Sequence, residues 1–203
     1  MFSKITAEVT GSADVCKCIS PQQFSNEPSL SYLLPDEIAY IFLKSSKEEH
    51  IFTNQAYITC KGSSATTTRR LIERYEYSTT QIINVNFETA GMSMSDRDVE
   101  LKFTLLEPNP SKFKFNSGSH NISIDIWKNE IEIAKTFYKT IVELSKVQKK
   151  NIDLLALSKY AVGSFKVPQS SKCIYPALEF AEACVQRYCP HSYQQVFEQC
   201  LSV

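Results

Sequence analysis

The sequence has few glycines and few histidines, and both shortages argue against catalysis. Only 5 of the 203 residues are glycine, so the chain contains no glycine-rich loop of the kind that cradles phosphate groups. The 3 histidines, His50, His120 and His191, do not fall in a serine or cysteine motif of known catalytic mechanism. We therefore expect a protein that is not an enzyme and that carries no cofactor.

The sequence also lacks an excess of charge of either sign. The 22 lysines and arginines are balanced by 22 aspartates and glutamates, so no global field would draw the chain onto nucleic acid. Uncharged apolar runs all fall short of the about 18 residues that a membrane-spanning helix needs. The first residues, Met1 to Glu8, contain no apolar segment of a secretory signal. These absences predict a cytoplasmic protein without a nucleic-acid partner.

The cysteines are odd in number in a chain without a secretory signal, so reduced thiols are expected rather than disulfides. The 7 are Cys16, Cys18, Cys60, Cys173, Cys184, Cys189 and Cys200. The alternative is a zinc site of the Cys3His type formed by Cys184, Cys189, His191 and Cys200. These residues lack the spacing of a paired zinc knuckle, and the first two do not share one helix face. Buried thiols without a metal are therefore the preferred interpretation.

The overall composition is that of a globular protein, with 43% hydrophobic and 22% charged residues. The length fits one domain with an appended element. Shifts in composition predict a loosely ordered arm over residues 1–32, a domain over residues 33–147, and a helical, cysteine-containing tail over residues 148–203. The charged segment 146–151 is expected to be a hinge.

Alternating apolar residues predict a series of antiparallel strands. The clearest pair has Ile83, Val85 and Phe87 on one strand and Val99, Leu101, Phe103 and Leu105 on the next, joined by a polar turn that contains Gly91. Further strands are expected at residues 38–43, 51–60, 69–77 and 112–115, with a tight turn at Asn54-Gln55 that divides the second of these. The total is six to seven strands.

Apolar residues then recur at helical spacing from Ile126 to Leu144, which predicts an amphipathic helix of about five turns. Its apolar stripe is wide enough to cover an open side of the strands. Shorter helices are expected at residues 152–162, 176–188 and 193–201.

Three motifs carry a resemblance to a known family. They are Leu34-Pro-Asp-Glu, His50-Ile-Phe-Thr-Asn, and Phe87-Glu-Thr-Ala-Gly followed by Asp98-Val-Glu-Leu-Lys. In this order, over about residues 33–145, the chain resembles the bacterial-type pleckstrin-homology (PH) domain family. The resemblance implies an α+β fold, a PH-like antiparallel barrel or sandwich closed by a C-terminal amphipathic helix, and it also implies oligomeric assembly. Gln55-Ala56 departs from the family, which usually has a basic residue there.

A basic cluster is the main candidate for a ligand site. Lys61, Arg69, Arg70 and Arg74 lie on or beside one predicted strand, and such side chains hold phosphates by charge-assisted hydrogen bonds. The alternative is a solvated strand face on which they pair with Glu73 and Glu76, which is the commoner use of such charges.

These patterns favour a non-enzymatic adaptor or scaffold that contacts other proteins and self-assembles into a homo-oligomer. The strand that starts at Arg69 and the strand 112–115 would offer unpaired edges for such contacts. The alternative function is binding of phosphoinositide or other anionic lipid headgroups by the basic cluster, with peripheral contact to a membrane.

Overall fold

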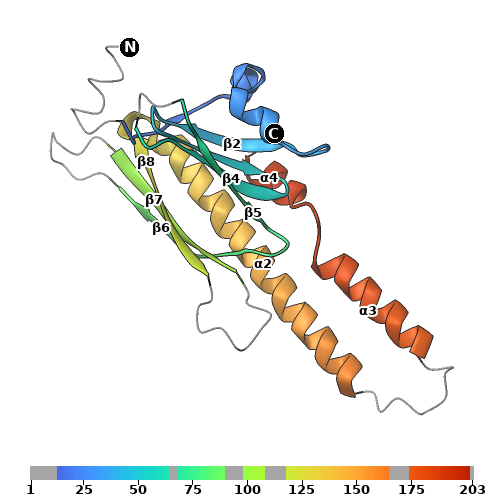
Figure 1. The fold of residues 1–203 in the computed structure, drawn as a ribbon. Helices are drawn as coiled ribbons and strands as arrows, with labels where there is room; N and C mark the ends of the chain where they lie inside the picture. Colours follow the sequence, from blue (N-terminus) through green and yellow to red (C-terminus); the bar gives the residue numbers. More distant parts are fainter. Residues whose placement is uncertain (1–12, 65–67, 90–97, 108–117, 165–173, 202–203) are drawn as a thin grey trace.

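The computed structural model describes residues 13–64, 68–89, 98–107, 118–164 and 174–201. They form two antiparallel sheets, a long helix beside them, and two shorter helices that follow it (Figure 1). The expected PH-like α+β architecture is therefore confirmed, and it takes the form of a sandwich of two sheets.

The larger sheet has five strands in the order β1-β2-β3-β4-β5. They are β1 (Lys17–Cys18), β2 (Ala39–Lys44), β3 (Glu48–Thr53), β4 (Ala56–Lys61) and β5 (Leu71–Glu76). The strand predicted from residues 51–60 is divided at Asn54-Gln55, as expected. The strand predicted to start at Arg69 is β5, and it lies at an edge of this sheet.

The smaller sheet has three strands, β6 (Gln81–Glu88), β7 (Asp98–Leu106) and β8 (Ser119–Trp127). The predicted antiparallel pair is confirmed, because Ile82 lies opposite Leu105 and Phe87 opposite Leu101. The predicted common face of Ile83, Val85 and Phe87 is wrong at its first residue, because an irregularity in the register between Ile83 and Asn86 puts Ile82 into the core instead. The turn at Gly91 and the strand predicted at residues 112–115 lie outside the described residues.

The start of the long helix was predicted too early. Residues 119–127 form β8, in which Ile122, Ile124 and Ile126 alternate and are buried. A short 3-10 turn at Lys128–Glu130 follows, and the helix begins only at Ile131. Ile126 fits both the two-residue period of the strand and the three- to four-residue period of the helix. This overlap puts the predicted start of the helix too early.

Residues 13–32 are packed on the sandwich, so the prediction of a loosely ordered arm is wrong for them. They include β1, which pairs with β2, and the short 3-10 helices η1 (Pro21–Asn26) and η2 (Pro28–Tyr32). Cys16 is fully buried, and its main chain forms an isolated parallel β-bridge with Ile126 of β8. The polar composition of this segment concealed the few residues that anchor it. Residues 1–12 lie outside the described residues.

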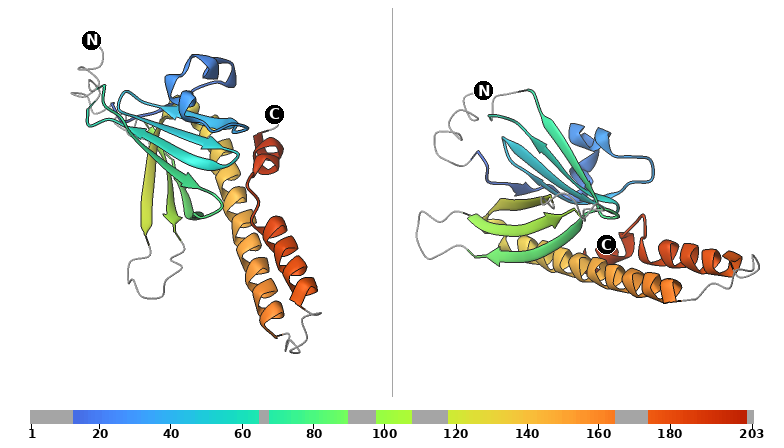
Figure 2. Two further views of the ribbon diagram at one scale, coloured as in Figure 1. Left: turned by 45° about the vertical axis from the view of Figure 1, so that its right-hand side comes forward. Right: turned by 60° about the horizontal axis from the view of Figure 1, so that its bottom comes forward.

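Three helices complete the chain, namely α2 (Ile131–Ser164), α3 (Ile174–Tyr188) and α4 (Gln194–Leu201). The hinge expected at residues 146–151 is wrong, because α2 runs through it without a break. That segment contains neither glycine nor proline, and its lysines and glutamine are good helix formers. At 34 residues, α2 is about 50 Å long and extends well past the sheets, with α3 beside it (Figure 2).

The core lies between the two sheets and is rich in aromatic rings. Tyr57 of the larger sheet and Phe103 of the smaller one meet edge to face, with ring centroids 5.2 Å apart. A second, smaller cluster lies on the other face of the larger sheet, where Phe24 and Leu30 cover Phe42 and Ile58. Because both faces are covered, β2 reads as the continuous apolar run that the sequence shows.

Candidate functional sites

Lys61, Arg69 and Arg70 lie at one end of the larger sheet. Lys61 is the last residue of β4, opposite Glu48 of β3, and Arg69 and Arg70 directly precede β5. One guanidinium nitrogen of Arg70, Nη2, donates to the carbonyl of Ser46 at 3.3 Å. The other, Nη1, is buried without a hydrogen-bonding partner among the described residues.

Arg74, the fourth residue of the predicted basic cluster, serves a different purpose. Its Nη1 atom donates to both carboxylate oxygens of Glu37, at 2.9 and 2.8 Å, and its Nε donates to Glu76. The Glu37 side chain has no exposed surface. Arg74 therefore neutralises a buried carboxylate through Nη1, and its Nη2 is buried without a hydrogen-bonding partner among the described residues.

The Glu37 carboxylate also explains two of the sequence motifs. The main-chain N–H of Leu34 donates a hydrogen bond to this carboxylate at 2.9 Å. The hydroxyl of Thr53 donates a second, shorter one. Burial alone would raise the pKa of Glu37, but the hydrogen bonds from Arg74, Thr53 and Leu34 outweigh burial and hold the pKa below its usual value. The Leu-Pro-Asp-Glu turn and the Phe-Thr-Asn segment thus meet in one polar network.

Asn54 extends this network to the end of the chain. Its Oδ1 accepts a hydrogen bond from Ile38 N–H at 2.8 Å, and its Nδ2 donates to Ser192 Oγ at 3.1 Å. Its carbonyl accepts from Tyr193 N–H. The motif residues therefore have structural roles: they join β2, β3 and the segment that leads into α4.

The four residues of the alternative zinc site are not brought together. Cys184 is buried in α3, His191 is exposed, and Cys189 and Cys200 are partly exposed. Within the part of the chain that the structure describes, no three of these four place ligand atoms within 4.8 Å of one another. Cys200 packs at the margin of the main core instead. Cys173 lies outside the described residues.

A different cluster, which the sequence did not suggest, does bring ligand atoms together. One possible ligand atom each from Cys16, Glu48 and His50 lies within 4.8 Å of the others. Cys16 is fully buried and His50 is 1% exposed. The 34-residue separation of Cys16 and His50 carries no recognisable metal-binding spacing, and only the packing of β1 against β8 places the thiol next to β3.

The surroundings of this cluster are acidic. Burial raises the pKa of the Cys16 thiol, and the carboxylates of Glu48, Asp125 and Asp14 raise it further. Burial, with Asp98, Glu100 and Glu48 nearby, raises the pKa of Asp125 to about 6. The negative charge here is thus only partly compensated.

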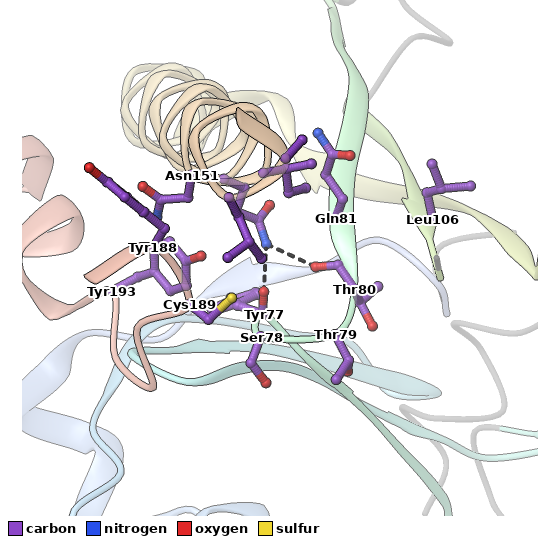
Figure 3. A pocket seen from close by; sticks show the side chains of 14 residues that line it. Tyr77, Ser78, Thr79, Thr80, Gln81, Leu106, Asn151, Tyr188, Cys189 and Tyr193 are labelled. Atoms are coloured by element: carbon purple, nitrogen blue, oxygen red, sulfur yellow. Dashed lines mark hydrogen bonds between the residues drawn. The ribbon is translucent and has the colours of Figure 1, made fainter. Parts of the chain in front are cut away.

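A cavity of about 350 Å³ lies between the turn after β5, the middle of α2 and the start of α4 (Figure 3). Gln148 spans one side of it, donating to the carbonyls of Thr80 and Tyr77 at 2.8 and 3.2 Å. Its lining contains aromatic, aliphatic and amide side chains but no charged residue. Such a cavity suits an apolar group better than an ionic ligand.

A third feature is a set of exposed apolar residues on the projecting helices, which we call the hairpin face. Its members have exposed fractions between 46% and 78%, and they are Ile152, Leu157 and Tyr160 of α2 and Phe180 and Val185 of α3. Ile152 also lines the cavity. Large apolar side chains left exposed on a projecting element are candidates for a protein contact site.

None of the helices, over the described residues, combines the length and the apolar character needed to cross a lipid bilayer.

The two stacked antiparallel sheets with a following helix define a PH-like protein, and comparison with known proteins gives the family. The family model for the bacterial PH domain matches residues 9–150. The chain is 34% identical over 153 residues to the uncharacterized protein YvbH of Bacillus subtilis (strain 168), covering 74% of this chain and 68% of that protein. This chain therefore belongs to the bacterial PH domain family.

A solved structure shares the fold over almost the whole chain. It is a PH-domain-containing bacterial protein from Exiguobacterium sibiricum 255-15, with a TM-score of 0.77 and 23% sequence identity, covering 93% of this chain and 100% of that one. Because the match covers 93% of the chain, the shared fold extends into the helices after residue 150.

Proposed function

We propose that this protein is a non-enzymatic adaptor that contacts proteins through its hairpin face, and that its partner there is a second copy of the same chain. Membership of the bacterial PH domain family supports a general protein- or lipid-binding module. The observation that carries the more specific proposal is the exposure of the apolar side chains of α2 and α3.

The form of the hairpin favours a second copy as the partner. Both helices that project beyond the sheets carry exposed apolar residues (Figure 2). A twofold contact between two such hairpins would cover all of them, since each copy presents the same patch to the other. Charged residues of both signs lie on these helices, as in the pair of Lys149 with Asp153 at 3.1 Å, so charge does not favour a partner of one sign.

Light scattering of the full chain over a range of concentrations tests the proposal. The wild type is expected to have at least twice the monomer mass, and the double variant Leu157→Glu, Tyr160→Glu is expected to be monomeric. The control is Leu71→Glu, which changes an equally exposed apolar residue on edge strand β5. A monomeric wild type, or dissociation by Leu71→Glu alone, would contradict the proposed surface.

Anionic headgroup binding is the second candidate, and the arrangement of Arg70 favours it. Its Nη1 atom has no partner among the described residues, and Lys61 and Arg69 lie at the same end of the sheet. We expect sedimentation with phosphoinositide-containing vesicles, weakened by Arg69→Glu with Arg70→Glu and unchanged by Lys146→Glu on α2. Equal sedimentation of all three proteins would remove this candidate.

A further inference from the structure

The Cys16, Glu48 and His50 cluster lies beside the β-bridge that joins Cys16 to Ile126 of the smaller sheet. Cys16 directly precedes β1 and bridges to β8 of the smaller sheet, whereas Glu48 and His50 belong to β3 of the larger one. The cluster is thus built from two separate segments of the sandwich, and it shares no residue with the hairpin face or with the cavity beside Gln148.

The main chain around Cys16 is firmly held. Its N–H donates to the carbonyl of Asp125 at 2.7 Å, and its own carbonyl accepts from Trp127 N–H at 3.1 Å. Its thiol donates a hydrogen bond to the carbonyl of Asp14 at 3.6 Å. The sulfur is therefore fixed in place, and without a metal ion the buried thiol stays protonated.

His50 is held by one ring nitrogen and presents the other to the cluster. Nδ1 lies 2.7 Å from the hydroxyl of Tyr57, a fully buried side chain of β4. Nε2 is buried and makes no hydrogen bond among the described residues, although Glu48 Oε1 is 3.1 Å away, because the two groups are not aligned for one. A histidine held through one ring nitrogen, with the other buried beside a carboxylate and a thiol, has the arrangement of a metal ligand.

The charges around the cluster also favour a cation. Glu48 is joined by Asp14 and Asp125, both of which act on the Cys16 thiol. Lys47 pairs with Asp14 at 3.1 Å, and Lys61 and Lys47 both act on the Glu48 carboxylate. A divalent ion at the centre of the cluster would compensate the remaining carboxylate charge.

We propose that the Cys16 sulfur, His50 Nε2 and a Glu48 carboxylate oxygen bind one divalent metal ion of the zinc class. One thiolate, one imidazole and one carboxylate form a ligand set that zinc accepts in tetrahedral geometry, with a water in the fourth position. Atoms bonded to one zinc ion lie about 3.3 to 3.8 Å apart. The Glu48 side chain, 21% exposed, has the freedom to close the remaining separation and leaves a path for the ion.

Binding would convert the thiol into a thiolate and release its proton to solvent. The ion would then join the start of β1 to β3 next to the bridge between β1 and β8. It would act as a staple that holds the N-terminal segment on the sandwich, in addition to the two residue pairs, Lys17 with Lys44 and Cys18 with Leu43, that join β1 to β2.

Cobalt titration of the full chain, previously treated with a chelator, tests the site. We expect one Co²⁺ per chain, visible d–d bands of tetrahedral cobalt, and a sulfur-to-cobalt charge-transfer band that zinc abolishes by displacement. Cys16→Ser should remove the charge-transfer band. The matched controls Cys60→Ser and Cys189→Ser should retain it, since neither residue belongs to the cluster.

Two further variants keep the test decisive if Cys16→Ser does not fold, as judged by circular dichroism. Glu48→Gln changes a partly exposed ligand and should weaken cobalt binding. Tyr57→Phe removes the group that orients His50 and should lower the affinity by about 10-fold or more. No charge-transfer band in the wild type, a band retained by Cys16→Ser, or unchanged affinity in both further variants would each overturn the proposal.

Discussion

The sandwich and the projecting hairpin use the same kinds of side chain in opposite ways. Phe103 and Tyr57 are enclosed between the sheets, at 2% and 0% exposure, whereas Phe180 and Tyr160 of the hairpin are 49% and 78% exposed. Removal of apolar surface from water is the main source of stability. The sandwich therefore contains most of the folding free energy, and the hairpin keeps apolar surface available for a partner.

The largest effect is expected from truncation of a ring in the sandwich. Phe103→Ala leaves a cavity between the sheets and should lower the free energy of unfolding by about 3 to 5 kcal/mol. The matched change Phe180→Ala in the hairpin should alter it by only about 0.5 kcal/mol at low protein concentration. Urea unfolding followed by circular dichroism measures both, and similar losses would contradict the distinction between the two regions.

A slightly smaller effect is expected when the buried carboxylate of Glu37 loses its partner. Arg74→Met leaves that charge uncompensated and should cost about 3 kcal/mol in the free energy of unfolding. Adding Glu37→Gln to Arg74→Met should restore part of the loss, because the amide carries no charge. A double variant less stable than Arg74→Met would show that the pair is not the cause.

The Glu37–Arg74 pair also makes the stability of the sandwich depend on pH. The pKa of Glu37 is lowered in the folded protein. Its carboxylate therefore stabilises the fold fully at pH values above the usual carboxyl pKa of 4.5. This stabilisation is lost as the pH falls through the lowered pKa. Thermal unfolding below pH 4.5 should show a smaller further loss of stability in Glu37→Gln than in the wild type. Parallel curves would exclude this origin of acid sensitivity.

An intermediate effect is expected where the hairpin joins the sandwich. Gln148 of α2 accepts from Ile82 N–H at 2.9 Å and donates to two carbonyls of the β5–β6 turn. Gln148→Leu leaves these buried groups without partners and should cost about 2 kcal/mol. Gln195→Leu changes an exposed glutamine of α4 and is the control; urea unfolding should distinguish the two.

The smallest effect on stability is expected on the hairpin face itself. Leu157→Glu with Tyr160→Glu should change the free energy of unfolding of the monomer by about 0.5 kcal/mol or less, because both side chains are exposed. The same variant is expected to change the association state most. A large loss of monomer stability would show that these residues pack within the chain.

The sequence predicted those features that depend on a regular period. Alternation located the β6–β7 pair, turn-forming residues located the division at Asn54-Gln55, and helical spacing located α3 and α4. It failed at Ile126, where two periods overlap, and at residues 146–151, where charge was taken for a break. It also failed for residues 13–32, since burial of one residue such as Cys16 leaves no period to detect.

The candidate sites were harder to predict than the fold, for a related reason. In the sequence, Arg74 cannot be distinguished from Arg70. Arg74 has a structural role only because the fold places it next to the buried carboxylate of Glu37. Glu48 and His50 are in β3, and Cys16 directly precedes β1, with β2 between these two strands in the sheet. The spacing of the three residues along the chain gives no sign that their ligand atoms meet.

The sequence alone thus established the class of fold, its PH-like motifs and its balanced charge. Periodicity and motifs depend only on residues that are close along the chain, and net charge depends only on composition. Tertiary structure alone decided which charged and thiol side chains meet. Strand pairing and sheet stacking bring together residues from distant segments, as they do for Glu37 with Arg74 and for Cys16 with Glu48 and His50.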